Sequence, residues 1–115
     1  VHSDLRSKAA MRLIVAILKP SLVESVRQAL AAVEVTRMTI CDAQGFRSRG
    51  ASGDRRPVQE AVIEIACNDD FVGRATEAIA HVMDASGEAT AGRLFTLPMV
   101  DAVQLYREVR GPEAV

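Results

Sequence analysis

The chain has no tryptophan, few other aromatic side chains and almost no net charge, and each shortage excludes a class of protein. Aromatic residues make up 3% of the 115 residues and apolar residues 49%, so the core must be aliphatic. A formal net charge of −1 gives no general attraction to nucleic acid or to an anionic membrane. No apolar run approaches the roughly 20 residues that a membrane span needs. We therefore expect one cytoplasmic domain that has no nucleic-acid partner and does not insert into a membrane.

Cysteine and histidine are also too scarce to suggest catalysis or a metal centre. Cys41 and Cys67 fall within predicted strands without the spacing of a metal or redox motif, which favours buried, inert thiols in a reducing cytoplasm. His81 falls on a predicted helix, where a surface or half-buried histidine is more common than a catalytic base. No Cys/His or Ser/His/Asp set can be placed. We expect no enzyme, no catalytic residue, no metal site and no catalytic cofactor.

One pattern occurs twice in the chain, 49 residues apart (Leu13 to Val62). The segments 13–30 and 62–79 each have an aliphatic run, then a polar capping residue (Ser21 or Asp70), then an apolar stripe at helical spacing. Two strand–helix units, each followed by another strand, form a split βαβ arrangement. The predicted fold class is therefore α+β, a ferredoxin-like double βαβ sandwich with an antiparallel sheet.

The predicted elements and segments extend this pattern over the whole chain. Ser21 and Glu24 have the spacing of a capping box at the start of the first helix. Residues 1–10 are interpreted as a flexible N-terminal extension, with Met11 as the natural first residue and 11–115 as the domain. We expect strands over 12–18, 37–46, 58–67 and 93–98, an extended segment over 100–109, helices starting at Ser21 and after Asn68–Asp70, a helix end near Gly87, and polar loops over 47–57 and 86–92.

Both faces of the first predicted strand are aliphatic, although two helices can cover only one face of a four-stranded sheet. An exposed aliphatic sheet face is the kind of patch that marks an interface, so the sequence predicts an oligomer. Glu64 stands alone in an apolar strand, and an ion pair at the subunit interface is its best explanation. The two sets on the first strand are Leu13, Val15 and Ile17, and Ile14, Ala16 and Leu18.

Four local sequences are more specific in their order and spacing than any of them is alone. They are MRLIVAILKPSLVESVRQAL, VTRMTICDAQGF, IEIACNDD and SGEATAGRLFTLP. Together they resemble the nitrogen regulatory PII signal-transduction family, from Met11 to about Gly111. The resemblance implies a homotrimer with an adenine nucleotide (ADP, AMP or ATP) in each cleft between subunits. It also implies regulation of a partner protein in nitrogen or carbon metabolism through the loop Arg47–Pro57.

The resemblance further implies which residues bind the nucleotide. Thr39 and Ala66 would lie near the base, and the Gly45-Phe46 turn would lie against the ligand. The loop from Gly87 to Arg93 would hold the phosphates, because backbone N–H groups of such a loop bind anions and the guanidinium adds a fixed charge. Without the family context, the same loop would be an ordinary helix-to-strand connection. The implied nucleotide-binding residues are Thr39, Gly45, Phe46, Ala66, Gly87, Thr90, Gly92 and Arg93.

Departures from the family imply a changed ligand preference. Glu60 stands where the family has a lysine that pairs with 2-oxoglutarate, and the family's glutamine for this ligand has no counterpart. Gln104 and Tyr106 stand where two late arginines clamp the phosphates, although Arg107 and Arg110 lie nearby. The partner-binding loop is shorter than usual and contains no tyrosine to be modified. We expect no useful 2-oxoglutarate binding, and ADP or AMP at least competitive with ATP.

Two further points stay open at the level of sequence. The loop contains Arg47, Arg49, Arg55 and Arg56, which form either an ordinary solvated surface or, in a trimer, a cationic surface for an anionic ligand or an acidic partner. The alternative function is a small-metabolite or anion sensor without ATP or 2-oxoglutarate sensing. That sensor would be an ACT-like amino-acid-binding domain or a bicarbonate-linked branch of the PII-like proteins.

Overall fold

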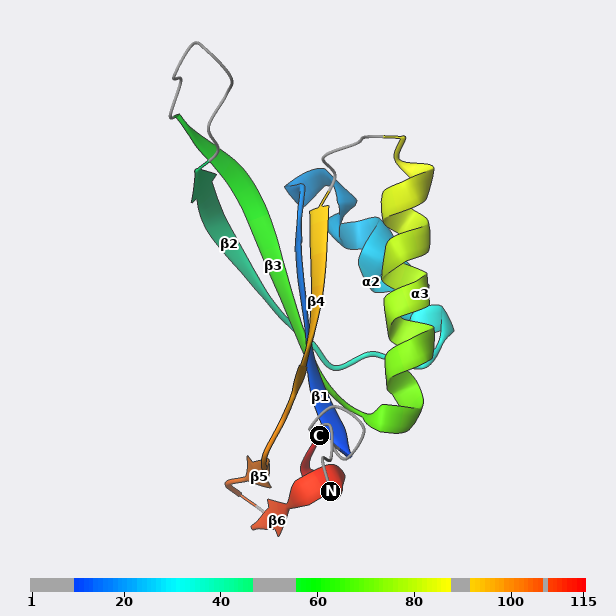
Figure 1. The fold of residues 1–115 in the computed structure, drawn as a ribbon, viewed down its shortest axis with the longest axis vertical. Coiled ribbons are helices and arrows are strands. Elements are labelled where there is room, and N and C mark those ends of the chain that lie inside the picture. Colours follow the sequence, from blue (N-terminus) through cyan, green and yellow to red (C-terminus); the bar gives the residue numbers. More distant parts are fainter. Residues whose placement is uncertain (1–9, 47–55, 88–91, 107) are drawn as a thin grey trace, which may run out of the picture.

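The fold is a four-stranded antiparallel sheet with two helices packed on one of its faces (Figure 1). The computed structural model describes residues 10–46, 56–87, 92–106 and 108–115. The strand order is β2-β3-β1-β4, and each neighbouring pair is antiparallel. This is the order of a split βαβ pair, so the predicted ferredoxin-like fold is confirmed. The elements are β1 (Met11–Leu18), η1 (Pro20–Leu22), α2 (Val23–Ala32), β2 (Thr39–Phe46), β3 (Pro57–Asn68), α3 (Asp69–Ala85) and β4 (Gly92–Pro98).

The repeated pattern of the sequence becomes a repeated packing arrangement. Val26 and Leu30 of α2 are fully buried, and so are Ala75 and Ile79 at the matching positions of α3. Residues four apart lie on the same side of a helix, so each pair forms the stripe that contacts the sheet. No helix in the described parts of the chain combines the length and apolar composition needed to cross a bilayer.

The first helix begins differently from the prediction. Pro20–Leu22 forms a turn of 3₁₀ helix, and α2 starts at Val23 without a side-chain cap. The Glu24 carboxylate instead accepts hydrogen bonds from Arg27, at 3.0 Å from Nε and 2.8 Å from Nη2. These hydrogen bonds hold the pKa of Glu24 below its usual value. The capping box predicted for Ser21 is therefore wrong, because its acidic partner pairs one turn further along the helix.

The second helix is placed as predicted at both ends. Asn68 stands at the N-cap of α3, although its side chain makes no cap hydrogen bond. Asp69 in the first turn accepts a 2.7 Å hydrogen bond from Arg12 of β1, which ties the helix start to the sheet. Gly87 follows the helix end with φ of 71°, a left-handed conformation that glycine adopts easily.

The C-terminal part differs from the extended segment predicted over 100–109. It contains a short hairpin of β5 (Val103–Gln104) and β6 (Val109–Arg110), followed by the 3₁₀ turn η3 (Gly111–Ala114). The Gly111 N–H donates a 2.8 Å hydrogen bond to the Ala102 carbonyl and closes the hairpin. The prediction failed because such short strands leave too little alternation to distinguish a hairpin from one strand. Figure 1 shows the hairpin beyond the start of β1 and the end of β4, on the side opposite that at which β2 and β3 project.

Side chains of the sheet alternate between two unequal faces. The face under the helices contains Ile14, Ala16 and Leu18 of β1 with Ile63 and Ile65 of β3, each at most 1% exposed. No described helix covers the other face, as Figure 1 shows, and we call it the open face. By strand register, the open face comprises Thr39, Cys41, Ala43 and Gly45 of β2; Val58, Glu60, Val62, Glu64 and Ala66 of β3; Leu13, Val15 and Ile17 of β1; and Arg93, Phe95 and Leu97 of β4.

The two cysteines lie on opposite faces, which corrects one prediction. Cys67 is buried under the helices, and this burial raises the pKa of its thiol. Cys41 is exposed on the open face, so the expectation that both thiols are buried is wrong for this residue. Strand alternation alone could not decide this, because it does not show which face the helices cover. His81 is exposed on α3, in agreement with the interpretation as a surface histidine.

Candidate functional site

Four of the eight predicted nucleotide-binding residues lie on the open face: Thr39, Gly45, Ala66 and Arg93. Thr39 pairs with Glu64, and Ala66 lies two residues further along β3, so Thr39 and Ala66 are diagonal neighbours. Gly45 lies six residues along β2 from Thr39, roughly 20 Å away at strand spacing. Arg93 lies on β4, three strand positions from β2 or about 14 Å. One protomer therefore brings together the two residues expected near the base but not the expected phosphate contacts.

The other four predicted residues are Phe46, Gly87, Thr90 and Gly92, and none of those that the structure describes lies on the open face. Phe46 points away from the open face and is 70% exposed. Gly87 is exposed at the end of α3. Thr90 lies outside the described residues, with the rest of 88–91.

Gly92 has a packing role that the sequence did not indicate. It is the first residue of β4 and pairs with Leu18, rather than belonging to the loop. A Cβ at this position would lie 2.5 Å from the Ile17 carbonyl oxygen and 3.0 Å from Cε of Met83. The close contact of β4 with β1 and α3 therefore requires glycine here, and this requirement is independent of any contact with a phosphate.

The carboxylate of Glu60 lies on the β2–β3 ribbon close to its loop end, where Phe46 pairs with Pro57. Its residue is only 6% exposed, and a Cβ on Gly45 would lie 2.6 Å from Cδ and 2.9 Å from Oε1 of Glu60. Gly45 thus leaves the space that the glutamate side chain occupies. A carboxylate therefore occupies the part of the open face next to the ends of β2 and β3 that lead to residues 47–56.

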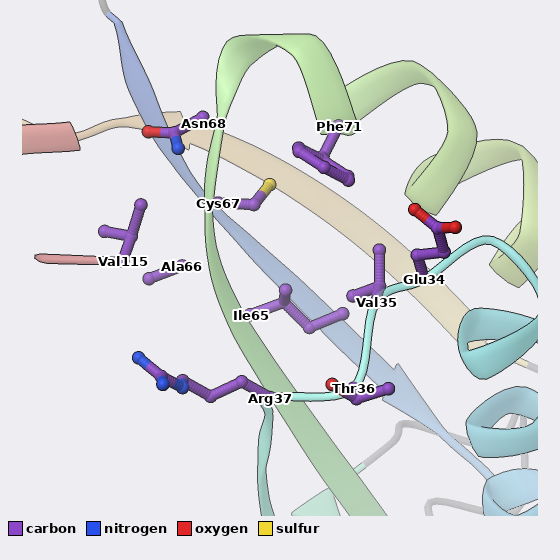
Figure 2. A pocket seen from close by; sticks show the side chains of 10 residues that line it. All are labelled: Glu34, Val35, Thr36, Arg37, Ile65, Ala66, Cys67, Asn68, Phe71 and Val115. Atoms are coloured by element: carbon purple, nitrogen blue, oxygen red, sulfur yellow. The ribbon is translucent and has the colours of Figure 1, made fainter. Parts of the chain in front are cut away.

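A pocket of about 160 Å³ lies at the end of β3, where that strand has no neighbour on one side (Figure 2). The β2–β3 pairing begins at Thr39 and Glu64, so Ile65–Asn68 pair only with β1 among the described strands. We call this pocket the β3-edge pocket. Its lining residues are Glu34, Val35, Thr36, Arg37, Ile65, Ala66, Cys67, Asn68, Phe71 and Val115.

Figure 2 shows that the lining divides at β3. Apolar side chains, among them Cys67 and Phe71, lie on the helix side, while Ala66, Asn68 and Arg37 lie on the open-face side. The volume is about half the smallest size typical of pockets for drug-sized ligands, near 300 Å³. It suits one flat ring system and not a whole nucleotide.

Arg37 and Asn68 were missed by the sequence reasoning. Arg37 was assigned to the start of a strand, whereas β2 begins two residues later, and Asn68 was assigned to the helix cap alone. No spacing in the sequence links them, because the pocket forms only when the segment before β2 crosses the free end of β3. Ala66 is the predicted site residue that lies with them in the lining.

The C-terminal hairpin presents the positions at which the family's late arginines are missing. Tyr106 is 99% exposed and Leu105 87% exposed, and Val100 before the hairpin is fully exposed. Gln104 is half-buried in β5. Within the described residues, no three His, Cys, Asp or Glu side chains gather in a way that could hold a metal ion.

Comparison with known proteins gives a consistent result. The family model for nitrogen regulatory protein P-II matches residues 11–109. Nitrogen regulatory protein GlnK1 of Methanosarcina mazei is 28% identical, over 92% of this chain and 98% of its own length. Nitrogen regulatory protein P-II of Rhizobium etli is 32% identical, over 91% of this chain and 100% of its own length.

Solved structures show the same fold. The Arabidopsis thaliana PII bound to citrate superposes with a TM-score of 0.80 at 24% identity, over 95% of each chain. The B. subtilis GlnK–ATP complex superposes with a TM-score of 0.81 at 23% identity, over 91% of this chain and 95% of that one.

Proposed function

Because the chain belongs to the nitrogen regulatory protein P-II family, we propose that it is a regulatory protein that binds an adenine nucleotide, ADP, AMP or ATP, in clefts between the subunits of a homotrimer. It regulates a partner protein in nitrogen or carbon metabolism, in the cytoplasm, and has no catalytic role of its own. The family match over 11–109 supports a single domain that starts at Met11. The complex of the related B. subtilis GlnK with ATP supports the class of ligand.

The open face is the observation that carries this proposal. It contains Leu13, Val15 and Ile17 in its centre, with Phe95 and Leu97 on β4 still 45% and 44% exposed. Apolar area of this kind is stabilised when another surface covers it, at about 25 cal/mol per Å². The same face contains four of the predicted ligand contacts, so an assembly that covers it also encloses them.

The spacing of those contacts explains why the ligand belongs between subunits. The β3-edge pocket holds a base-sized group beside Ala66, with Thr39 as a diagonal neighbour. By strand register, Arg93 of the same protomer lies two strands and four residues from Ala66, roughly 16 Å away. In the proposed trimer, the phosphates are held by the Gly87–Arg93 loop or by Gly45 of an adjacent subunit.

The shape of the β2–β3 ribbon supports a separate role in partner binding. Figure 1 shows that β2 and β3 project past the helices at the end that leads to the Arg47–Pro57 loop. Arg56, just before β3, is exposed, whereas Arg47, Arg49 and Arg55 lie outside the described residues. The projecting ribbon carries the ends of β2 and β3, at Phe46 and Pro57, away from the body of the protomer, which supports a role of the segment between them in partner binding.

Two measurements test the proposal together. Light scattering on a size-exclusion peak should give about three times the 12.4 kDa chain mass. Calorimetry with ATP, ADP, AMP, cyclic AMP, 2-oxoglutarate, bicarbonate and a set of amino acids should show saturable binding of an adenine nucleotide. A hit restricted to an amino acid or to bicarbonate would instead establish one of the alternative sensors.

A further inference from the structure

Two polar side chains of the β3-edge pocket have no partner within the described part of the chain. The Asn68 Oδ1 is buried and accepts no hydrogen bond. Although Asn68 occupies the N-cap of α3, where asparagine side chains usually accept from the helix, it makes no such bond. Arg37 is exposed and has no ion pair among the described residues. A buried polar atom without a partner is costly, so a group that supplies the missing hydrogen bond is favoured here.

The two side chains stand on either side of a small residue. Figure 2 shows the carboxamide of Asn68 and the guanidinium of Arg37 on the same side of β3, with the methyl group of Ala66 between them. The small alanine leaves the surface of the sheet open to a flat ring. The pocket thus offers an apolar floor, a planar cation and a side-chain amide.

We infer that Arg37 and Asn68 recognise the base of the bound nucleotide, a conclusion that rests on the proposed function. Rotation about χ2 of Asn68 turns its amide edge toward the ring. The oxygen then accepts from the exocyclic amine, and the nitrogen donates to the neighbouring ring nitrogen N7. The guanidinium of Arg37 packs on the face of the ring, an interaction that planar Arg makes well.

This arrangement selects adenine over a 6-oxopurine. Along the edge that carries N7, adenine presents one donor and one acceptor, which match the acceptor and donor of an amide. Hypoxanthine presents two acceptors along that edge, so the oxygen of Asn68 stays without a partner. The loss of one such pairing corresponds to roughly a tenfold or larger difference in affinity.

The test compares ADP with inosine diphosphate, which differs from it in the base alone. Calorimetry is run on the parent, on Asn68→Ala and on Arg37→Ala. Gln28→Ala and Arg27→Ala serve as matched controls, because both residues lie on the exposed surface of α2 and contact Glu24. Thermal unfolding of each variant shows whether α3 and the fold are intact.

The parent should prefer ADP by about tenfold or more, and Asn68→Ala should bring the two affinities close together. Arg37→Ala should weaken both nucleotides by a similar factor and leave their ratio unchanged. The inference is overturned if the parent binds both equally, or if folded Asn68→Ala keeps the parent's ratio, and the nucleotide function then still stands. If the parent binds no nucleotide, the proposed function fails and the inference fails with it.

Discussion

The two faces of β1 have the same aliphatic composition and opposite surroundings. On β1, Ile14 and Leu18 under the helices are at most 1% exposed, whereas Val15 and Ile17 on the open face remain partly exposed. Both sets come from one aliphatic run, because successive residues of a strand point to opposite faces. One face completes the core of the protomer, and the other remains available to an assembly.

The difference between the faces also separates stability from function. Within the described residues, the buried polar or charged residue is Glu60, which belongs to the open face, and the helix-covered face buries only apolar side chains. The predicted ligand contacts Thr39, Ala66 and Arg93 also belong to the open face. Changes to one face should therefore alter folding, and changes to the other should alter assembly and binding.

The strongest test of this separation places a charge in the centre of the open face. Val15 lies between Glu64 and Phe95 in the register, so Val15→Lys should abolish the proposed trimer and leave a folded protomer. Burying this ammonium costs several kcal/mol even with the Glu64 carboxylate opposite, because the desolvation penalty exceeds the attraction of the pair. Light scattering gives the mass and circular dichroism the fold. Ala31→Lys, on the exposed surface of α2, is the control and should stay trimeric. A trimeric Val15→Lys would show that this face is not the interface.

A smaller side chain under the helices should instead destabilise the fold of the protomer. Ile63 is 0% exposed, and Ile63→Ala should lower the free energy of unfolding by about 2–5 kcal/mol, since it removes buried methyl groups and leaves a cavity. Leu97→Ala, on the open face and 44% exposed, should cost much less in the dissociated Val15→Lys background. Urea unfolding of both in that background measures folding without assembly. Equal losses would contradict the division between the faces.

Arg93→Ala examines the ligand contacts on the open face. It should weaken ADP by roughly 1.5–3 kcal/mol, tenfold or more, because it removes one charge-assisted contact to a phosphate. The proposed trimer should persist, because Arg93 lies on the edge strand β4 and its replacement removes no apolar side chain from the open face. Calorimetry and light scattering on the same sample check both expectations. Unchanged ADP affinity would assign the phosphates to other residues, such as Arg110.

The sequence predicted the fold well because its signals are periodic. The aliphatic runs, the helical stripes and their repetition identified all four strands of the sheet and both helices. Local hydrogen bonds were harder to predict, because Glu24 has two possible partners and only the structure shows that it pairs with Arg27. The pairing of β5 with β6 was missed for the related reason that each strand has two residues.

The candidate site was predictable only in part. Family motifs led to Thr39 and Ala66, which lie together, and to Arg93, which shares their face. The motifs did not lead to Arg37 and Asn68, because these residues meet through the crossing of the α2–β2 connection over the end of β3. For Gly92 the motif predicted a ligand contact, whereas the structure shows that the residue packs closely against Ile17.

Glu60, near the loop end of the β2–β3 ribbon, should act against the binding of 2-oxoglutarate. The carboxylate of Glu60 beside Gly45 should repel the ligand by an amount on the order of a few kcal/mol at an effective dielectric constant of about 20. Calorimetry with Mg and ATP present should therefore show no useful affinity for 2-oxoglutarate. Saturable binding with a Kd below about 100 μM would mean that cationic side chains of the loop attract the ligand more strongly than this carboxylate repels it.

The smallest expected effects concern the two cysteines, because Cys41 lies on the open face and Cys67 lies under the helices. Cys67 should resist alkylation until the protomer unfolds, whereas Cys41 should react quickly in dissociated Val15→Lys and slowly in the trimer. Burial raises the pKa of Cys67 in the folded state, so the unfolded state loses its thiol proton first as pH rises. The contribution of this thiol to the free energy of unfolding is therefore fully present below the ordinary pKa of cysteine and decreases as the pH rises above it. Urea unfolding between about pH 7 and pH 10 should show this decline, and Cys67→Ala should reduce it. If Cys67→Ala leaves the alkaline decline unchanged, burial under the helices does not hold this thiol in its protonated form, and the two faces differ less than their exposures indicate.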